Sequence, residues 1–189
     1  MVWRRVGGFW GYGDAKPRLV VVTDSITIVA GPRGRWDATP IVQWMLSMQV
    51  SSAFVISYPG ARVLSGDYLR IVEAAVSLGA QHMVIVSMGN DVTATAETIT
   101  EGLRCVLRRF PAARVVYGAS GAVWGYANEA YDDTVQKVCS ILGCTSGTRE
   151  LYGARTSDFI GHLHVEAVPR LCDAIVTWCL SAVIARTKL

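Results

Sequence analysis

Charged residues are scarce in this sequence, and neither sign dominates. Asp, Glu, Lys and Arg together make up 17% of the 189 residues, and the formal net charge is +3. Because the Lys and Arg residues are also scattered along the chain, the charge pattern does not indicate a nucleic-acid partner. The hydrophobic fraction of 51% excludes a disordered chain, and the length suits one domain with a sizeable core.

Cysteine pairs at metal-binding or redox spacing are also missing. The chain has an odd number of Cys residues, and none of them form a Cys-x-x-Cys pair: Cys105, Cys139, Cys144, Cys172 and Cys179. Since the sequence shows no metal-ligand cluster either, we expect reduced thiols and no metal centre, which favours a cytoplasmic setting. One alternative stays open, which is pairing of Cys139 with Cys144 in an oxidising compartment.

No stretch of the sequence has the pattern of a secretory signal or a membrane span. Residues 1–13 lack an apolar h-region, which also favours a cytoplasmic location. The apolar run at residues 171–185 is short and interrupted by Asp173, which favours a buried helix. We expect residues 1–17 to form an irregular arm, rich in Gly and aromatic residues, ahead of a folded domain at residues 18–189.

Strand-like and helix-like stretches alternate along the rest of the chain. Apolar, β-branched runs predict strands at residues 18–23, 52–57, 82–87 and 113–117, and a weak fifth strand near residues 150–152. Helical patterns and end signals predict helices at residues 39–48, 66–78, 93–109, 129–142 and 165–186. The alternation predicts an α/β fold, namely a three-layer α/β/α (flavodoxin-like) domain with a parallel sheet of about five strands.

Polar and Gly residues follow the first three predicted strands, whose ends share one edge of a parallel sheet. They are Asp24-Ser25, Gly60 and Asn90. Acyl transfer by a Ser hydroxyl needs a base, a carboxylate that orients the base, and donors for the developing oxyanion. Ser25 is the candidate nucleophile. Its own N–H, the N–H of Gly60 and the side-chain amide of Asn90 are the candidate oxyanion donors.

Histidine supplies few candidates for the base, because the chain has only three. His82 begins a predicted strand, at the edge of the sheet opposite the strand ends. His162 and His164 lie in a loop ahead of the last predicted helix and remain as candidates. Two carboxylates near the strand ends, Asp24 and Asp91, are expected to brace their loops by local hydrogen bonding.

Four short motifs, in this order, resemble those of the SGNH (GDSL-like) hydrolase family. The family's first block, commonly Gly-Asp-Ser, appears at residues 23–27 as Thr-Asp-Ser-Ile-Thr, and its second-block glycine appears as Gly60. The third block, Gly-x-Asn-Asp or a close variant, appears at residues 89–91 as Gly-Asn-Asp. The fifth block, Asp-x-x-His followed by an apolar residue, appears at residues 158–163 as Asp-Phe-Ile-Gly-His-Leu. The resemblance covers the chain from residue 18 to its C-terminus.

The resemblance implies a role for each of these residues. Ser25 would be the nucleophile, His162 the base and Asp158 the carboxylate that orients the base. Gly60 and Asn90 would complete the oxyanion hole. The resemblance further implies a serine esterase of SGNH type, which hydrolyses carboxylic esters through an acyl-enzyme without a metal or organic cofactor. Ester, thioester and acetyl-sugar substrates all agree with it, and a small domain favours short acyl or acetyl groups.

Two features depart from the family pattern. Thr23 stands where the family commonly has Gly. Asp158 precedes His162 by four residues, which is one more than usual. His164 is therefore retained as an alternative base, and orientation of His162 by a backbone carbonyl as an alternative to Asp158.

A second interpretation is a binding or assembly module, which keeps this fold but has weak or no catalytic turnover. The N-terminal arm would then be its contact. A nucleotide or phosphate binder is less favoured, because the chain lacks Gly-x-Gly-x-x-Gly and Gly-x-x-x-x-Gly-Lys motifs. The expected partner is a small-molecule ester, with no nucleic acid and no membrane span, and the sequence leaves homo-oligomer formation open.

Overall fold

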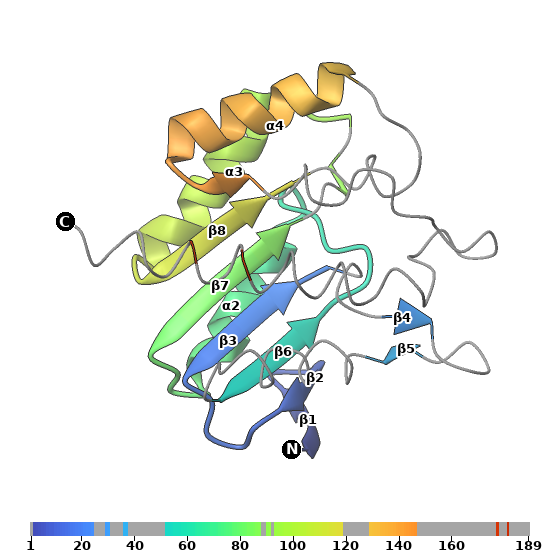
Figure 1. Cartoon of the computed structure of the whole chain (residues 1–189), viewed down its shortest axis with the longest axis vertical. Helices are drawn as coiled ribbons and strands as arrows, with labels where there is room; N and C mark the ends of the chain where they lie inside the picture. Colours follow the sequence, from blue (N-terminus) through green and yellow to red (C-terminus); the bar gives the residue numbers. More distant parts are fainter. Residues whose placement is uncertain are drawn as a thin grey trace.

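A sheet and a layer of helices make up most of the described molecule (Figure 1). The computed structural model describes residues 2–24, 29–30, 36–37, 52–87, 90–91, 93–118 and 129–146, and the single residues Thr177 and Ser181. The strands are β1 (Val2–Val6), β2 (Phe9–Gly13), β3 (Leu19–Thr23), β4 (Val29–Ala30), β5 (Trp36–Asp37), β6 (Ala53–Ser57), β7 (His82–Ser87), β8 (Ala113–Tyr117) and β9 (Thr145–Ser146). The helices are α2 (Asp67–Val76), α3 (Ala96–Arg109) and α4 (Glu129–Leu142).

The main sheet has seven strands in the order β1-β2-β6-β3-β7-β8-β9. From β6 to β9 each strand runs parallel to its neighbour, and β1 and β2 add an antiparallel edge. Numbered along the chain, the five parallel strands lie in the order 2-1-3-4-5, which is the flavodoxin-like order. The predicted fold class and its parallel strands are therefore confirmed, within a larger mixed sheet. A separate antiparallel pair joins β4 and β5.

Both faces of the parallel sheet are covered. Successive side chains of a strand point to opposite faces, yet Val20, Val21 and Val22 of β3 are all fully buried. Val20 and Val22 belong to a core cluster that includes Ile71 of α2 and Leu103 of α3. Helix α3 also packs against both α2 and α4, so these helices form one layer on that face (Figure 1). Burial of Val21 on the other face agrees with a three-layer arrangement.

The predicted helices are confirmed wherever the structure describes them. Helix α4 has the predicted limits, whereas α3 begins later than predicted, because Thr95 caps it by accepting a hydrogen bond from the N–H of Thr98 at 3.3 Å. The predicted helix at residues 39–48 lies outside the described residues, as does all of the helix at 165–186 except Thr177 and Ser181, which are helical. Among the described residues, no helix is long and apolar enough to cross a membrane.

The fifth parallel strand lies closer to α4 than predicted. Gly143, with φ 63°, ends the helix in the left-handed region, and a single further residue separates it from β9 at Thr145–Ser146. The predicted limits of 150–152 lie outside the described residues. The short connection arises because α4 ends beside β8, with which β9 pairs.

The N-terminal arm is a β-hairpin, and the prediction of an irregular arm is wrong for β1 and β2. Gly7 (φ 54°) and Gly8 (φ 94°) form the two-residue turn, with positive φ at both positions as a type I′ turn requires. Strand β2 then pairs with the edge of β6. A Cβ on Gly11 of β2 would lie 2.2 Å from the Phe54 ring, so glycine is needed there for close approach. A boundary between residues 17 and 18 stays a prediction.

Gly11→Ala is expected to lower the free energy of unfolding by about 1–3 kcal/mol, because the added methyl group overpacks the contact with β6. The measurement is a urea unfolding curve. Phe54→Leu, alone and combined with Gly11→Ala, completes a double-mutant cycle in which removal of the ring should relieve part of the loss. An unchanged midpoint for Gly11→Ala would show that the hairpin does not pack as described.

Candidate active site

The candidate site lies at the carboxyl ends of β6, β3 and β7. Strand β3 pairs with both of its neighbours in parallel, so the three strands end at the same edge (Figure 1). In the 2-1-3-4-5 order, the chain passes from β3 to β6 on one side and then crosses to β7 on the other side, so the strand order reverses between β3 and β7. Ligands of such folds bind in the crevice at that point. Asp24 follows β3, Gly60 follows β6 and Asn90 follows β7. The strand ends predicted to converge are thus on adjacent strands.

A tight turn follows β6. The N–H of Ala61 donates to the carbonyl of Tyr58 at 3.0 Å, with Pro59 and Gly60 at the central positions. Gly60 has φ 74°, so the turn is of type II, which requires a positive φ at that position. Tyr58 is anchored to β3, because its N–H donates to the carbonyl of Thr23 at 2.9 Å.

The surroundings of Gly60 are open. Among the described residues other than its two chain neighbours, none has an atom within 4 Å of the position that a Cβ on Gly60 would take. Among the described residues, none accepts a hydrogen bond from its N–H. This N–H is therefore free of described partners at the edge where a ligand would approach.

Asn90 reaches across to this turn. Its Nδ2 donates to the carbonyl of Ala61 at 3.0 Å. A carboxamide nitrogen carries two hydrogens, so this bond uses one and leaves the second for another acceptor. The contact holds the side chain against the turn that contains Gly60, and the role of the two residues as oxyanion donors stays a prediction.

Asp91 holds the same two loops together. Its Oδ2 accepts from the N–H of Val63 at 2.8 Å, and its Oδ1 accepts from the N–H of Leu64 at 3.3 Å. The residue is 4% exposed, and a buried carboxylate needs such donors. Asp91 therefore has the expected hydrogen-bonding role, but the prediction that its bonds are local is wrong, because the two described partners of its carboxylate lie in the loop after β6.

Asp91→Ala is expected to lower the free energy of unfolding by about 1–3 kcal/mol, because the buried N–H of Val63 loses its acceptor. The N–H of Leu64 adds less, since that residue is half-exposed and water can replace the carboxylate. Asp91→Asn, which keeps one acceptor oxygen, should lose less stability. Equal stability of Asp91→Ala and the wild type in urea would contradict the described contact.

Asp24 is fixed from the side of α2. The hydroxyl of Tyr68, in the first turn of α2, donates to Asp24 Oδ2 at 3.3 Å, and both residues are buried. Burial raises the pKa of the Tyr68 hydroxyl well above its usual value, and the charge of Asp24 raises it further. Tyr68 therefore stays protonated and remains a donor at neutral pH. The predicted bracing role of Asp24 agrees with this contact, although the sequence did not single out Tyr68.

The remaining predicted site residues lie outside the described part of the chain. Ser25 directly follows Asp24, and His162, Asp158 and the alternative base His164 belong to a later segment. Their roles stay predictions. His82 is described, and it is exposed at the start of β7, at the opposite edge from the strand ends as predicted.

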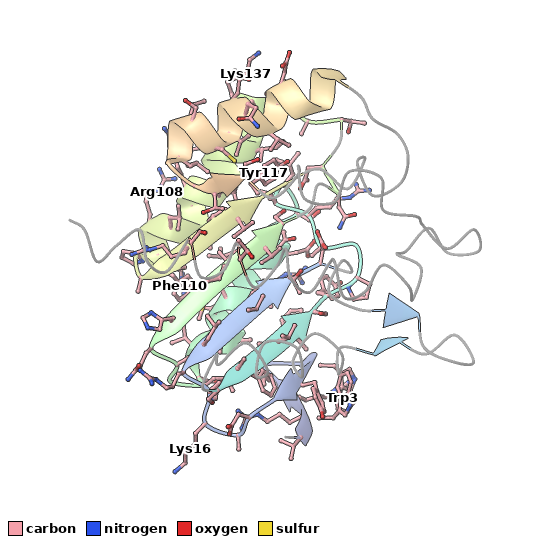
Figure 2. The ribbon with its side chains drawn as sticks, viewed as in Figure 1. Trp3, Lys16, Arg108, Phe110, Tyr117 and Lys137 are labelled. Atoms are coloured by element: carbon pink, nitrogen blue, oxygen red, sulfur yellow. The ribbon has the colours of Figure 1, made fainter. Side chains whose placement is uncertain are left out.

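The N-terminal hairpin also reaches the turn after β6. Phe9 of β2 packs edge-on against the ring of Tyr58, with ring centroids 5.4 Å apart. Trp3, which is labelled in Figure 2, pairs with Tyr12 on the hairpin itself, with ring centroids 5.0 Å apart. Phe9 therefore packs on the domain, at the turn that contains Gly60.

No protein-family model matches the sequence. No curated protein matches it either.

Three similar solved structures are esterases by their descriptions. A carbohydrate esterase family 2 enzyme with a carbohydrate-binding domain, from Corynascus thermopiles (Myceliophthora fergusii), has 14% identity and a TM-score of 0.59, over 89% of this chain and 67% of that chain. The acetyl xylan esterase Est2A from Butyrivibrio proteoclasticus has 13% identity and a TM-score of 0.53, over 85% of this chain and 62% of that chain. A catalytic mutant of Axe2, an acetylxylan esterase from Geobacillus stearothermophilus, has 13% identity and a TM-score of 0.56, over 86% of this chain and 94% of that chain. At such identities the likeness concerns the fold alone.

Proposed function

We propose that this chain is a serine esterase of SGNH type. Ser25 attacks the carbonyl carbon of a carboxylic ester, and His162 takes the hydroxyl proton and later gives it to the leaving alcohol. Asp158 orients His162. The N–H groups of Ser25 and Gly60 and the side-chain amide of Asn90 stabilise the oxyanion. Water then hydrolyses the acyl-enzyme, and no metal or organic cofactor takes part.

One observation carries the proposal. Asn90 is held beside Gly60 by its hydrogen bond to the carbonyl of Ala61, and the two lie at the edge where β3 leads into Ser25. Oxyanion stabilisation depends on donors that are already oriented before the reaction, because reorientation during the reaction would cost part of the gain. The Gly60 N–H, which donates to none of the described residues, and the braced carboxamide of Asn90 agree with this requirement.

The fold accommodates Thr23 at the position where the family usually has Gly. It is the last residue of β3, fully buried, and its carbonyl accepts from the N–H of Tyr58. Since a β-branched residue suits a buried strand, Thr is accommodated as part of the strand, with the turn beginning after it.

Short acyl groups, and acetyl groups on carbohydrates in particular, are the proposed substrates. The three similar structures are described as a carbohydrate esterase and two acetylxylan esterases, which supports this class for the same fold. Hydrolysis of p-nitrophenyl acetate should then exceed that of p-nitrophenyl butyrate. A preference for the longer ester would contradict the acyl-length part of the proposal and leave the serine mechanism standing.

The test is covalent labelling with a serine-directed fluorophosphonate, followed by mass spectrometry of the digested protein. The expected result is one phosphonate on Ser25 in the wild type and none in Ser25→Ala. Ser77→Ala is the matched control, because its exposed hydroxyl at the end of α2 bonds only locally to the carbonyl of Ala74, and it should label like the wild type. No labelling of the wild type would contradict the proposal and support the binding or assembly module.

A further inference from the structure

We propose that Cys139 and Cys144 form a dithiol modification site, which a small-molecule disulfide such as oxidised glutathione converts into an intramolecular disulfide. The site lies at the end of α4 and in the link to β9, and neither residue takes part in the proposed esterase chemistry. The inference is therefore independent of the proposed function.

The way in which α4 ends brings the two side chains together. Gly143 adopts φ 63°, and the N–H of Cys144 donates to the carbonyl of Cys139 at 3.2 Å. This is the Schellman arrangement, in which the N–H of the residue after the glycine donates to the carbonyl of the residue five positions before that residue. The accompanying contact usually joins two apolar side chains. Here it joins two thiols, and the Sγ atoms are 3.5 Å apart.

The distance suits a disulfide after a small adjustment. The sulfurs need to approach by about 1.5 Å to reach the usual bond length of about 2.0 Å. Cys144 sits between helix and strand, and is only partly buried. Cys139 is buried in the core cluster and Cys144 packs against the same cluster, so the approach of the two sulfurs depends on rotation of the less buried Cys144 side chain.

The thiol pair has an environment that favours one thiolate. The S–H of Cys144 donates to the Cys139 sulfur, and this hydrogen bond lowers the pKa of Cys139, while it raises that of Cys144. The S–H of Cys139 donates to the carbonyl of Tyr117 at 3.7 Å, at the end of β8 beneath α4 (Figure 2), and this contact fixes the position of the sulfur rather than favouring its thiolate. A thiolate is the form of cysteine that attacks disulfides.

The reaction balances with one molecule of oxidant. Cys144, the less buried thiol, loses its proton to water and attacks one sulfur of oxidised glutathione, whose S–S bond breaks and releases one glutathione thiolate. Cys139 then loses its proton to water and attacks the Cys144 sulfur of the mixed disulfide, which releases the second glutathione thiolate. The protein pair is oxidised by two electrons, and the oxidant is reduced to two thiols.

Cys105 provides an internal reference in the same molecule. It is exposed on α3, near Glu101 and Arg108, and it contacts no other described thiol. Oxidised glutathione should therefore leave a stable mixed disulfide on Cys105 and an intramolecular disulfide at the proposed site.

Peptide mapping of the reduced full-length chain separates these outcomes. Trypsin releases Cys139 and Cys144 on one peptide, residues 138–149, and Cys105 on residues 105–108. The oxidant concentration is raised until Cys105 carries glutathione, and free thiols are then alkylated before digestion. The expected result is a peptide 138–149 whose mass is two hydrogens lower than that of the reduced peptide and that carries no alkyl group. Two alkylated thiols on that peptide at this point would overturn the proposal, as would a disulfide that forms only in urea.

Single variants show whether both sulfurs are needed. In Cys139→Ser the mixed disulfide on the more exposed Cys144 has no second thiol to resolve it, so glutathione should accumulate there. Cys105→Ser, the matched control, should form the intramolecular disulfide as the wild type does. Rapid loss of glutathione from Cys144 in Cys139→Ser would point to a different partner and contradict the assigned pair.

Discussion

Ser25→Ala is expected to reduce kcat for p-nitrophenyl acetate by about 10⁴- to 10⁶-fold, with a small change in KM. The loss is this large because no acyl-enzyme can form without the hydroxyl, and only weak catalysis by the oxyanion donors remains. Initial rates of the wild type and the variant measure it. His162→Ala should reduce kcat by a similar factor. The double variant should have a kcat only slightly lower than either single variant, because the two groups act as a unit.

The pattern of losses decides between the alternatives that the sequence leaves open. Loss of activity in Ser25→Ala with activity retained in His162→Ala would indicate His164 as the base. Retained activity in Ser25→Ala would contradict the assigned nucleophile. Absence of turnover in the wild type would instead favour the binding or assembly module. Ser77→Ala serves as the control and should keep the wild-type rate.

Asn90→Ala is expected to reduce kcat by about 10²- to 10³-fold, because one oxyanion donor is lost where negative charge develops. KM should change little, since the donor acts mainly in the transition state. The same esterase assay measures the effect. Asn90→Asp should be at least as impaired, because the carboxylate lacks the donor and repels the oxyanion.

A structural explanation of the Asn90 effect can be separated from an electrostatic one. Asn90 also bonds to the carbonyl of Ala61, so its removal could loosen the turn after β6. Asp91→Asn weakens the anchoring of the same loop but leaves the Asn90 amide in place. If Asp91→Asn lowers kcat as much as Asn90→Ala at a similar loss of stability, the loop geometry rather than the amide controls the rate, and the donor role is wrong.

Strand and helix limits could be predicted where the local pattern is strong. Strands β7 and β8 have the predicted limits, because their apolar, β-branched runs are bounded by turn residues. The hairpin was harder to predict, although Gly7-Gly8 between two short runs is a hairpin signal. Glycine at residue 11 weakens the strand pattern, and only the approach of Phe54 from β6 explains why it is there.

For the candidate site, the sequence indicated positions but not the contacts that fix them. The rule that parallel strands end at one edge predicted that Asp24, Gly60 and Asn90 would lie on neighbouring segments. Tyr68 could not be singled out, because an aromatic residue in the first turn of a helix most often fills the core. Its hydrogen bond to Asp24 depends on how α2 packs against β3.

By itself, the sequence determined the alternation of strands and helices and the residues that follow each strand, because periodicity and turn chemistry depend on neighbouring positions. Only the tertiary structure decided that β3 lies between β6 and β7. It also decided that the Asp91 carboxylate accepts from the N–H of Val63, 28 positions away, and that the Asn90 amide donates to the carbonyl of Ala61, 29 positions away. A carboxylate and a carboxamide can bond to any backbone group that comes within reach, so strand order rather than local pattern selects their partners.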